Sequence, residues 1–204
     1  MPRVVLVAGM SQCPPRLDAD YIGVDHGAFT CLEHGIPMIA AVGDFDSVSE
    51  QERKQIEEAT TLLQLPSHKD ETDSEVAITY AMEQGYDDII LYGALGGRLD
   101  HELANLHLML YRNLPLTLMN EHNTVKIITP GTYHVKKIFR YLSFLALEDS
   151  CISERGVAYP LDHKFLTVQD IYSISNEILG DEAVITLHSG RMMMMQCDDS
   201  HDMK

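Results

Sequence analysis

No segment of the 204-residue chain reaches the roughly 18 to 20 consecutive apolar residues that a membrane-spanning helix needs. The apolar run in MPRVVLVAGM, at residues 1–10, is also too short for the hydrophobic region of a signal peptide. We therefore expect a cytoplasmic protein that has no membrane partner.

Cysteine is also scarce, with four residues scattered as Cys13, Cys31, Cys151 and Cys197. No two of them form a CxxC pair, the spacing that zinc sites and redox motifs commonly use. The pattern therefore argues against both kinds of site and favours buried or free thiols in a reducing compartment.

Basic side chains are few: 15 Lys and Arg stand against 31 Asp and Glu, for a formal net charge of −16. The resulting field repels polyanions, and the sequence has no basic stripe to overcome it. This argues against nucleic acid as a partner. A small anion such as a nucleotide is still compatible, because a single lysine, arginine, metal ion or helix N-terminus can bind phosphate locally.

Short apolar runs alternate with helix-like segments over roughly the first 120 residues, with predicted helices at 73–84 and 99–112. This alternation is typical of a parallel α/β sheet, in which ligands collect at the carboxyl ends of the strands. The later residues form short β-branched or alternating runs separated by Gly, Pro, Asn and Asp, which predict antiparallel strands. We expect a Rossmann-like parallel α/β domain at residues 1–122, followed by a smaller antiparallel β-sandwich domain at residues 123–204.

The four consecutive methionines at 192–195 follow the turn HSGR. We predict a strand that packs one face into the core, in preference to a soft-metal site. If this strand lies at the edge of the sandwich, RMMMMQC offers a contact surface for a second copy of the chain.

The segment VGDFDSVSE places Asp44 and Asp46 directly after the apolar run IAAV, with no lysine or arginine beside them. On an extended chain such residues point to the same side about 7 Å apart, and at an effective dielectric constant near 20 their repulsion is roughly 2 kcal/mol. Either one carboxylate caps the helix expected in SVSEQERKQIEE, or a divalent cation binds both of them.

A second acidic cluster, HKDETDSE, occupies residues 68–75. Thr72 and Glu75 have the spacing of a capping box, which places Asp73 in the first helical turn and Asp70 in the loop before it. The acidic side chains could serve only to stabilise the helix dipole. Lys69 favours a further role, because a lysine and two carboxylates in one loop can bind a phosphate together with its magnesium ion.

The third cluster is the glycine-rich turn in YGALGGRLDHELAN, where a strand leads into a helix that begins near Asp100. Gly97 and its neighbouring glycines let the backbone approach an anion closely, and Arg98 offers a fork suited to phosphate oxygens. The turn lacks the Gly-Lys-Ser/Thr ending of a Walker A loop. His101 and Asn105 share one helix face, either as polar ligands or as solvent contacts. Together the three clusters suit magnesium-assisted transfer of a phosphate-containing group.

The segments GVDHGAFTCLEHGIP, VGDFDS, HKDETDSEVAI and YGALGGRLDHELAN resemble successive blocks of the thiamine pyrophosphokinase family, in the same order and at comparable spacing. GVAYPL and YSISNE are similar to its thiamine-binding part, so the resemblance spans residues 23–190. It implies an enzyme that transfers the β,γ-pyrophosphoryl group of ATP to the hydroxyl group of thiamine, with Mg²⁺ as cofactor, and forms thiamine diphosphate and AMP. It also implies a homodimer with active sites between subunits.

The resemblance implies a role for each matched residue. The catalytic carboxylates would be Asp44, Asp46, Asp70, Asp73 and Asp100, of which the first four bind the metal. The nucleotide would contact Asp25, Lys69, Gly97, Arg98, His101 and Asn105. Ser175 and Asn176 would contact thiamine, and their role rests on the resemblance alone, since Ser-Asn is otherwise an ordinary turn. His26 stands where the family usually has a small residue, and residues 136–161 fit the family loosely.

Two other functions are compatible with parts of the sequence. AAVGDFDSV also resembles the signature of aspartate-nucleophile phosphatases, in which the first aspartate attacks the phosphate. That signature normally lies in the first strand, whereas two predicted strands precede it here, and GGRLDH has no role in that chemistry. The acidic loops could instead bind a metal or nucleotide without catalysis, as a sensor.

Overall fold

A computed structural model describes residues 2–66, 70–112 and 114–199, and its contacts divide the chain into two compact units, Met1–Glu121 and His122–Lys204. Over these described residues, none of the helices combines the length and the apolar character needed to cross a membrane. The predicted fold class, a parallel α/β sheet followed by antiparallel β structure, is confirmed.

The first unit contains a parallel sheet with the strand order β6-β5-β1-β2-β3-β4. Its strands are β1 (Arg3–Val7), β2 (Asp20–Val24), β3 (Ala40–Gly43), β4 (Thr61–Gln64), β5 (Asp88–Tyr92) and β6 (Leu116–Met119). The chain therefore builds the sheet outward from β1 to β4 and then returns to the other side of β1 with β5. The order reverses between β1 and β5.

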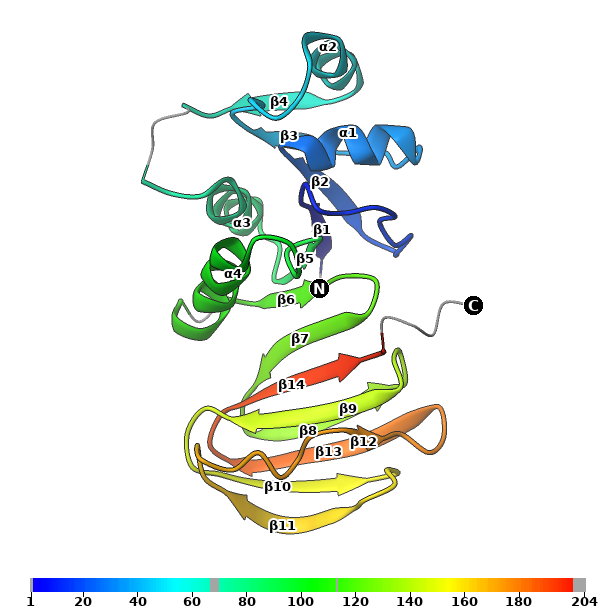
Figure 1. Cartoon of the computed structure of the whole chain (residues 1–204), viewed down its shortest axis with the longest axis vertical. Helices are drawn as coiled ribbons and strands as arrows, with labels where there is room; N and C mark the ends of the chain where they lie inside the picture. The colour runs from blue at the N-terminus through cyan, green and yellow to red at the C-terminus, as the bar shows by residue number, and fades with distance from the viewer. Residues whose placement is uncertain (1, 67–69, 113, 200–204) are drawn as a thin grey trace. The chain divides into compact units, whose positions relative to one another are not determined.

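The helices of this unit cover both faces of the sheet. They are α1 (His26–Glu33), α2 (Glu50–Ala59), α3 (Asp73–Glu83) and α4 (Leu99–Tyr111). Figure 1 shows α3 and α4 on the side of the sheet opposite α1. A parallel strand covered on both faces needs apolar residues at every position, and residues 4–7 of β1 are accordingly all buried. Val5 and Val7 pack on the side where Cys31 of α1 lies.

One close contact fixes how α1 meets the sheet. A Cβ atom on Gly23 of β2 would lie 2.3 Å from the Cα atom of Ala28 in α1. Any other residue at position 23 would push the helix away from the strand, so the glycine allows the close packing that places the start of α1 at the end of β2.

The second unit is a sandwich of two antiparallel sheets with the orders β12-β9-β14-β7 and β11-β10-β13-β8. Its strands are β7 (Asn123–Ile128), β8 (Gly131–Lys136), β9 (Tyr141–Ala146), β10 (Ser150–Arg155), β11 (Leu161–Leu166), β12 (Asn176–Glu177), β13 (Glu182–Ser189) and β14 (Met192–Cys197). Both sheets contribute to one apolar core, in which Phe144 of β9 and Ile152 of β10 are fully buried. This is the arrangement expected for alternating strands.

The methionine strand β14 packs as predicted but lies in an unexpected place. Met192 and Met194 are buried in the core, and Met193 and Met195 are only partly buried, which is the expected alternation. However, β14 pairs with β7 on one side and β9 on the other. The expectation that RMMMMQC forms a sandwich edge is therefore wrong, because the last strand of the chain inserts between two earlier ones.

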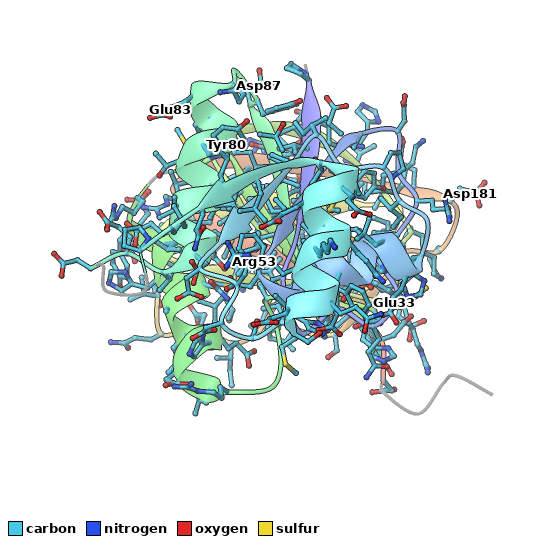
Figure 2. All side chains as sticks on the ribbon, turned by 90° about the horizontal axis from the view of Figure 1, so that it is seen from above. Glu33, Arg53, Tyr80, Glu83, Asp87 and Asp181 are labelled. Carbon is cyan, nitrogen blue, oxygen red and sulfur yellow. The ribbon has the colours of Figure 1, made fainter. Side chains whose placement is uncertain are left out.

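Much of the acidic excess lies in solvent. Glu33, Glu83, Asp87 and Asp181 are exposed, and Figure 2 labels their side chains. Cysteine pairing does not contribute to the fold, since Cys13, Cys31, Cys151 and Cys197 are all free thiols, as the sequence predicted.

Candidate active site

A cavity of about 470 Å³ lies in the first unit at the carboxyl ends of the strands. Its wall comes from the loops after β1, β2, β3 and β5 and from the first turns of α3 and α4. This is the point where the strand order reverses, and at such a point the loops of an open α/β sheet diverge and leave a crevice. The topology therefore produces the cavity, and the loops supply its chemistry.

Asp25 lines this cavity directly after β2, at the N-cap of α1, with a φ of 50° that non-glycine residues rarely adopt. Its Oδ1 accepts a hydrogen bond of 3.3 Å from the backbone N–H of Phe45. A Cβ atom on Gly43 would lie only 2.0 Å from this oxygen, so the carboxylate fits only because residue 43 is glycine. Backbone strain of this kind is often found at functional sites.

The pKa of Asp25 is raised from 3.8 to about 7. Burial is the largest cause, followed by the negative charge of Asp73; the charge of Asp44 adds to the effect, and the Phe45 N–H opposes it. Asp73 also shares a hydrogen bond with Asp25. Three carboxylates from three loops thus act on one another, and a nearby cation would stabilise all of them in the ionised form.

The expectation that Asp44 and Asp46 point to the same side of an extended chain is wrong. β3 ends at Gly43, and Phe45 has a φ of 59°, so the two aspartates do not lie on an extended chain. Instead, Asp44 Oδ1 accepts a hydrogen bond of 3.1 Å from the backbone N–H of Asp46. Asp44 is half-buried, whereas Asp46 is exposed, and neither belongs to the cavity wall.

The helix after this loop is capped without either aspartate. Ser49 caps α2 through a full capping box, in which its hydroxyl accepts from the backbone N–H of Glu52 and the Glu52 carboxylate accepts from the N–H of Ser49 at 2.7 Å. The helix-cap explanation of the acidic pair is therefore excluded, and the cation explanation stays a prediction.

Of the second acidic cluster, Asp73 is the residue that reaches the cavity. It lies half-buried in the first turn of α3, next to Thr72, whose hydroxyl accepts a hydrogen bond of 3.2 Å from the N–H of Glu75 as the capping pattern predicted. Asp70 is exposed and lies outside the cavity wall. Lys69 lies outside the residues that the structure describes.

The glycine-rich turn also contributes to the cavity wall, through Gly93, Ala94 and Gly96, whereas the predicted nucleotide contact Gly97 is not part of it. Gly93, Gly96 and Gly97 all have positive φ angles, of 78°, 89° and 79°. A Cβ atom on Gly93 would lie 2.2 Å from the hydroxyl of Ser11, and one on Gly97 would lie 2.8 Å from the methyl of Met10. The turn therefore requires glycine for conformation and for its contact with the loop after β1.

Arg98 is the N-cap of α4 and forms an ion pair of 2.6 Å with Asp100. The charge and hydrogen bonds of Arg98 lower the pKa of the Asp100 carboxyl. The two side chains are 73% and 66% exposed, and such exposed pairs stabilise a protein little. Arg98 lines the cavity and Asp100 does not, so a phosphate in the cavity can compete for the guanidinium.

His101 and Asn105 line the cavity from the same face of α4, as their spacing predicted. Asn105 is buried, and its Nδ2 donates a hydrogen bond of 3.1 Å to the carbonyl of Ala94. This bond holds the glycine-rich turn against the helix. His26, which stands where a small residue was expected, also lies in the cavity wall and can therefore contact a ligand directly.

The loop after β1 is part of the site, although no motif in the sequence had pointed to it. Ala8, Gly9 and Met10 all line the cavity, and Met10 is exposed beside Gly97. The available signal was their position directly after the first predicted strand, since the first strand–helix turn borders the crevice in such folds.

The predicted metal ligands are only partly brought together. Within the described ranges, no three His, Cys, Asp or Glu side chains are grouped closely enough to hold a metal ion by themselves. The charges of Asp73 and Asp44 both act on Asp25. The residues present thus fit a cation that takes part of its ligands from a bound phosphate, the common pattern for magnesium.

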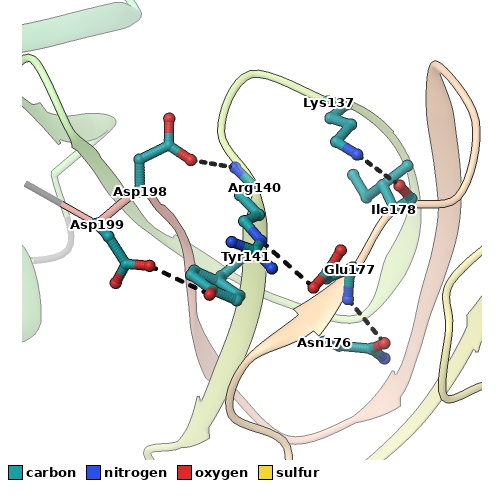
Figure 3. A network of polar contacts seen from close by, with 8 residues as sticks. All are labelled: Lys137, Arg140, Tyr141, Asn176, Glu177, Ile178, Asp198 and Asp199. Atoms are coloured by element: carbon teal, nitrogen blue, oxygen red, sulfur yellow. Dashed lines mark hydrogen bonds and ion pairs between the residues drawn. The ribbon is translucent and has the colours of Figure 1, made fainter. Parts of the chain in front are cut away.

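The predicted thiamine contacts lie in the second unit. Ser175 is exposed and has a φ of 62°, and its N–H donates to the Ser143 hydroxyl at 2.9 Å. Asn176, in β12, is buried, and its Oδ1 accepts from the N–H groups of Tyr159 and Glu177 at 3.0 and 2.9 Å. Figure 3 shows the contact with Glu177, which also pairs with Arg140 at 3.5 Å. Asn176 lines a second cavity of about 220 Å³, and Ser175 does not.

Two family models match the chain. The model described as thiamin pyrophosphokinase, catalytic domain, matches residues 18–118, and the model described as thiamin pyrophosphokinase, vitamin B1 binding domain, matches residues 131–192. The second match includes the smaller cavity entirely, and the first includes the larger cavity except for Ala8, Gly9 and Met10 of the loop after β1.

Individual proteins are similar over nearly the whole chain. The thiamine pyrophosphokinase of Bacillus subtilis (strain 168) is 35% identical over 188 residues, which cover 88% of this chain and 87% of that protein. A crystal structure of a thiamin pyrophosphokinase family protein from Enterococcus faecalis superposes with a TM-score of 0.85 at 32% identity, covering 97% of this chain and 100% of that one. The crystal structure of the Bacillus subtilis enzyme gives a TM-score of 0.84 at 32% identity, with 97% and 99% covered.

Proposed function

The chain belongs to the thiamin pyrophosphokinase family, and we propose that it transfers the β,γ-pyrophosphoryl group of ATP to the hydroxyl group of thiamine, giving thiamine diphosphate and AMP. The observation that carries the proposal is the cavity at the strand reversal. Its wall combines the carboxylates of Asp25 and Asp73 with the guanidinium of Arg98 and a glycine-rich turn.

Helix termini support the assignment of this cavity to ATP. The N-cap side chains of α1 and α4 accept no hydrogen bond from the first helical turn, whereas Ser49 and Thr72 cap α2 and α3. In α4 the N–H of His101 donates to Oδ1 of Asp100 at 3.1 Å, and this exposed contact is one that a phosphate could replace. Uncapped N–H groups and the positive end of the helix dipole favour phosphate. Both uncapped termini border the cavity, through Asp25 and Arg98. Its volume of about 470 Å³ lies within the roughly 300–1,000 Å³ typical of ligand sites.

Magnesium dependence is part of the proposal. The ion would be held by Asp73 and Asp44, with Asp46 and Asp70 from the neighbouring loops, and bound Mg²⁺ would neutralise the charge of the phosphates during transfer. The repulsion that raises the pKa of Asp25 supports this assignment, because it marks a place where the fold concentrates negative charge.

The remaining residues position the substrates. Arg98 would exchange its exposed partner Asp100 for phosphate oxygens, and Asn105 would hold the glycine-rich turn in place while the phosphates bind. Ser175 and Asn176 belong to the unit that would bind thiamine. We also propose a homodimer with active sites between subunits. Large apolar side chains exposed on the second unit support an interface there; they include Phe165, Ile171, Tyr172 and Leu179.

No observation favours the aspartate-nucleophile phosphatase. The nucleophile of such an enzyme would be Asp44, but this residue follows the third strand, lies outside the cavity wall and has Oδ1 engaged with the N–H of Asp46.

The test is to incubate the purified protein with Mg²⁺, ATP and thiamine and to quantify all products. We expect AMP and thiamine diphosphate in equal amounts, and no product when a chelator removes the metal ion. ADP as the product, release of phosphate that does not need thiamine, or the absence of turnover would contradict the proposal. Turnover that survives complete removal of divalent cations would contradict its magnesium part alone.

A further inference from the structure

The second unit contains its own cavity, of about 220 Å³, at the junction of β10, the start of β11 and the segment that leads into β12. Its wall is mainly aromatic and aliphatic, with a carboxyl, an amide and a hydroxyl among the apolar groups. The side chains used below are Glu154, Tyr159, Leu161, Tyr172, Ile174 and Asn176. The volume is below the roughly 300–1,000 Å³ of sites that enclose a whole drug-sized ligand, so the cavity suits one ring of a larger molecule.

Glu154 is the unusual member of this wall. It is only 1% exposed, yet no basic side chain pairs with it among the described residues. Its Oε2 accepts a hydrogen bond of 2.9 Å from Nδ2 of Asn176, and its Oε1 is buried with no hydrogen-bond partner in the described part of the chain. A buried polar atom without a partner costs about 1–3 kcal/mol, and native proteins leave few of them.

The orientation of this carboxyl is fixed by its neighbour. Both hydrogens of the Asn176 amide are used, one on Glu154 and one on the carbonyl of Tyr159 at 2.9 Å, and its oxygen accepts from two backbone N–H groups. Asn176 therefore cannot turn to serve the second oxygen of Glu154. Oε1 is left buried without a hydrogen-bond partner among the described residues, on a side chain that belongs to the cavity wall.

The chemistry of the cavity defines its ligand. The lining includes the side chains of Leu161 and Ile174 and those of Tyr159 and Tyr172, which are 73% and 66% exposed, and a lining of this kind favours an aromatic ring. A single buried acceptor favours a ring that carries an N–H donor, because such a donor would satisfy the atom that the fold leaves unpaired. Thiamine contains such a ring, an aminopyrimidine, at the end of the molecule away from its hydroxyl group.

We propose that Glu154 is a specificity-determining residue of the thiamine site, and that its Oε1 accepts a hydrogen bond from the amino group of the aminopyrimidine ring bound in this cavity. This inference rests on the proposed function and deepens it. The small volume leaves the thiazolium ring and the hydroxyethyl group outside the cavity, where the hydroxyl is free to accept the pyrophosphoryl group.

The substitution Glu154→Gln tests the inference, because it should change which of two substrates the protein prefers, thiamine or an analogue of it. The amide oxygen of glutamine would accept from Asn176 in place of Oε2, which turns the glutamine NH₂ group toward the cavity. At pH 8, above the value of about 7 to which burial raises the pKa of Glu154, the variant therefore presents a donor where the ionised wild-type side chain presents an acceptor, and the measurement is made at that pH. It should lose affinity for the amino-bearing ring and gain affinity for the analogue of thiamine in which an oxo group replaces the amino group.

The measurement is kcat/KM for thiamine and for this oxo analogue, with ATP saturating. We expect the wild-type protein to prefer thiamine, and Glu154→Gln to lower the ratio of the two values by about 10- to 100-fold, the size of one buried hydrogen bond that is lost or mismatched. The change should lie in the KM for thiamine, with the KM for ATP unaltered. If Glu154 had a purely structural role, the substitution would lower kcat/KM equally for thiamine and for the oxo analogue, and the ratio of the two values would not change.

Glu182→Gln is the matched control, because Glu182 is an exposed carboxylate of the same unit that pairs with His134. It should leave the ratio as in the wild type. Thermal unfolding monitored by circular dichroism establishes that each variant is folded. If Glu154→Gln does not fold, direct calorimetric binding of thiamine and the oxo analogue to the wild-type protein replaces it, and equal affinities overturn the inference.

The outcomes separate this inference from the function on which it rests. A wild-type protein that forms no thiamine-dependent AMP overturns the proposed function. A wild-type protein that turns thiamine over, together with a folded Glu154→Gln variant whose preference ratio is unaltered, overturns only the role of Glu154.

Discussion

Each of the two cavities contains a carboxyl group whose pKa is raised to about 7, but the causes differ. Burial raises the pKa of Asp25, and the neighbouring carboxylates of Asp73 and Asp44 raise it further. Burial alone raises the pKa of Glu154, and the hydrogen bond from Asn176 opposes it. The same shift therefore marks two kinds of site. A crowded carboxylate is stabilised by a cation, whereas an isolated buried carboxyl is stabilised by a proton or by a hydrogen-bond donor.

The backbone around Asp25 also differs from the backbone around Glu154. Asp25 and Phe45 both have positive φ, and Gly43 leaves room for the Asp25 carboxylate, so several loops are arranged to hold charge in one place. Glu154 lies in strand β10, next to a shift in its register with β11, and one amide on β12 fixes its carboxyl. The first arrangement suits the neutralisation of phosphate charge, and the second suits the recognition of a neutral donor.

The largest expected effect comes from removing one charge of the crowded group. Asp73→Asn should lower kcat by about 10²- to 10³-fold, the usual loss when one group that stabilises charge in the transition state is removed. The free energy of unfolding should change little, because the substitution also relieves repulsion with Asp25. Steady-state kinetics and chemical denaturation measure the two quantities.

Asp87→Asn serves as the matched control, since Asp87 is an exposed carboxylate of the same unit. It should keep wild-type turnover. Near-normal kcat in Asp73→Asn at saturating Mg²⁺ would show that the crowded carboxylates do not serve the reaction, and the distinction between the two cavities would then lose its functional meaning.

An intermediate effect is expected for the isolated carboxyl, in the pH dependence of stability. The folded-state pKa of Glu154 is raised from 4.5 to about 7, so the fold favours the protonated form. Its contribution is fully present below about pH 4.5 and is lost as the pH rises through about 7, for a total of about 3 kcal/mol at pH 8. Glu154→Gln has no such titration, so relative to the wild type it should gain up to about 3 kcal/mol in the free energy of unfolding between pH 4.5 and pH 8.

Urea denaturation of both proteins at the two pH values measures this gain, and Glu182→Gln should not show it. A constant difference between Glu154→Gln and the wild-type protein at both pH values would mean that Glu154 is ionised in the fold at neutral pH. The pKa of Glu154 would then not be raised in the folded protein, and Glu154 would not share this property with Asp25.

The smallest effect should come from a residue that belongs to neither cavity wall. Ser49→Ala removes the capping box of α2 and should cost about 1 kcal/mol in the free energy of unfolding, with kcat unchanged. Denaturation and steady-state kinetics measure this pair of values. A marked loss of turnover would indicate that the position of α2 matters to the loop that carries Asp44 and Asp46, and the site would extend beyond the cavity wall.

Local features were predictable from the sequence because they depend on neighbours in the chain. The starts of α2 and α3 follow from the hydroxyl residues Ser49 and Thr72, and the glycine-rich turn follows from positions that need positive φ. The alternating burial of the methionines in β14 follows from the two-residue period of a strand. The cap of α3 and the alternation in β14 were expected and are observed, whereas the sequence analysis had offered an aspartate as the cap of α2.

Other features depend on which segments meet. The sequence analysis placed Asp44 and Asp46 on an extended chain, but Phe45 turns the backbone between them. It considered β14 as an edge strand, but β14 pairs on both sides, since its register with β7 and β9 depends on residues far away in the sequence. Nothing near Glu154 in the sequence indicates that its carboxyl is buried beside Asn176.

The sequence by itself determined the elements, the fold class, the family and the loops that carry the chemistry, because period, capping residues and motif blocks are written in consecutive positions. The tertiary structure alone decided which carboxylates lie near one another, that the loop after β1 completes the cavity, and that one oxygen of Glu154 finds no partner among the residues that the structure describes. The physical reason is that burial and charge coupling depend on distances through space, and these are set only when the strands have been ordered and packed.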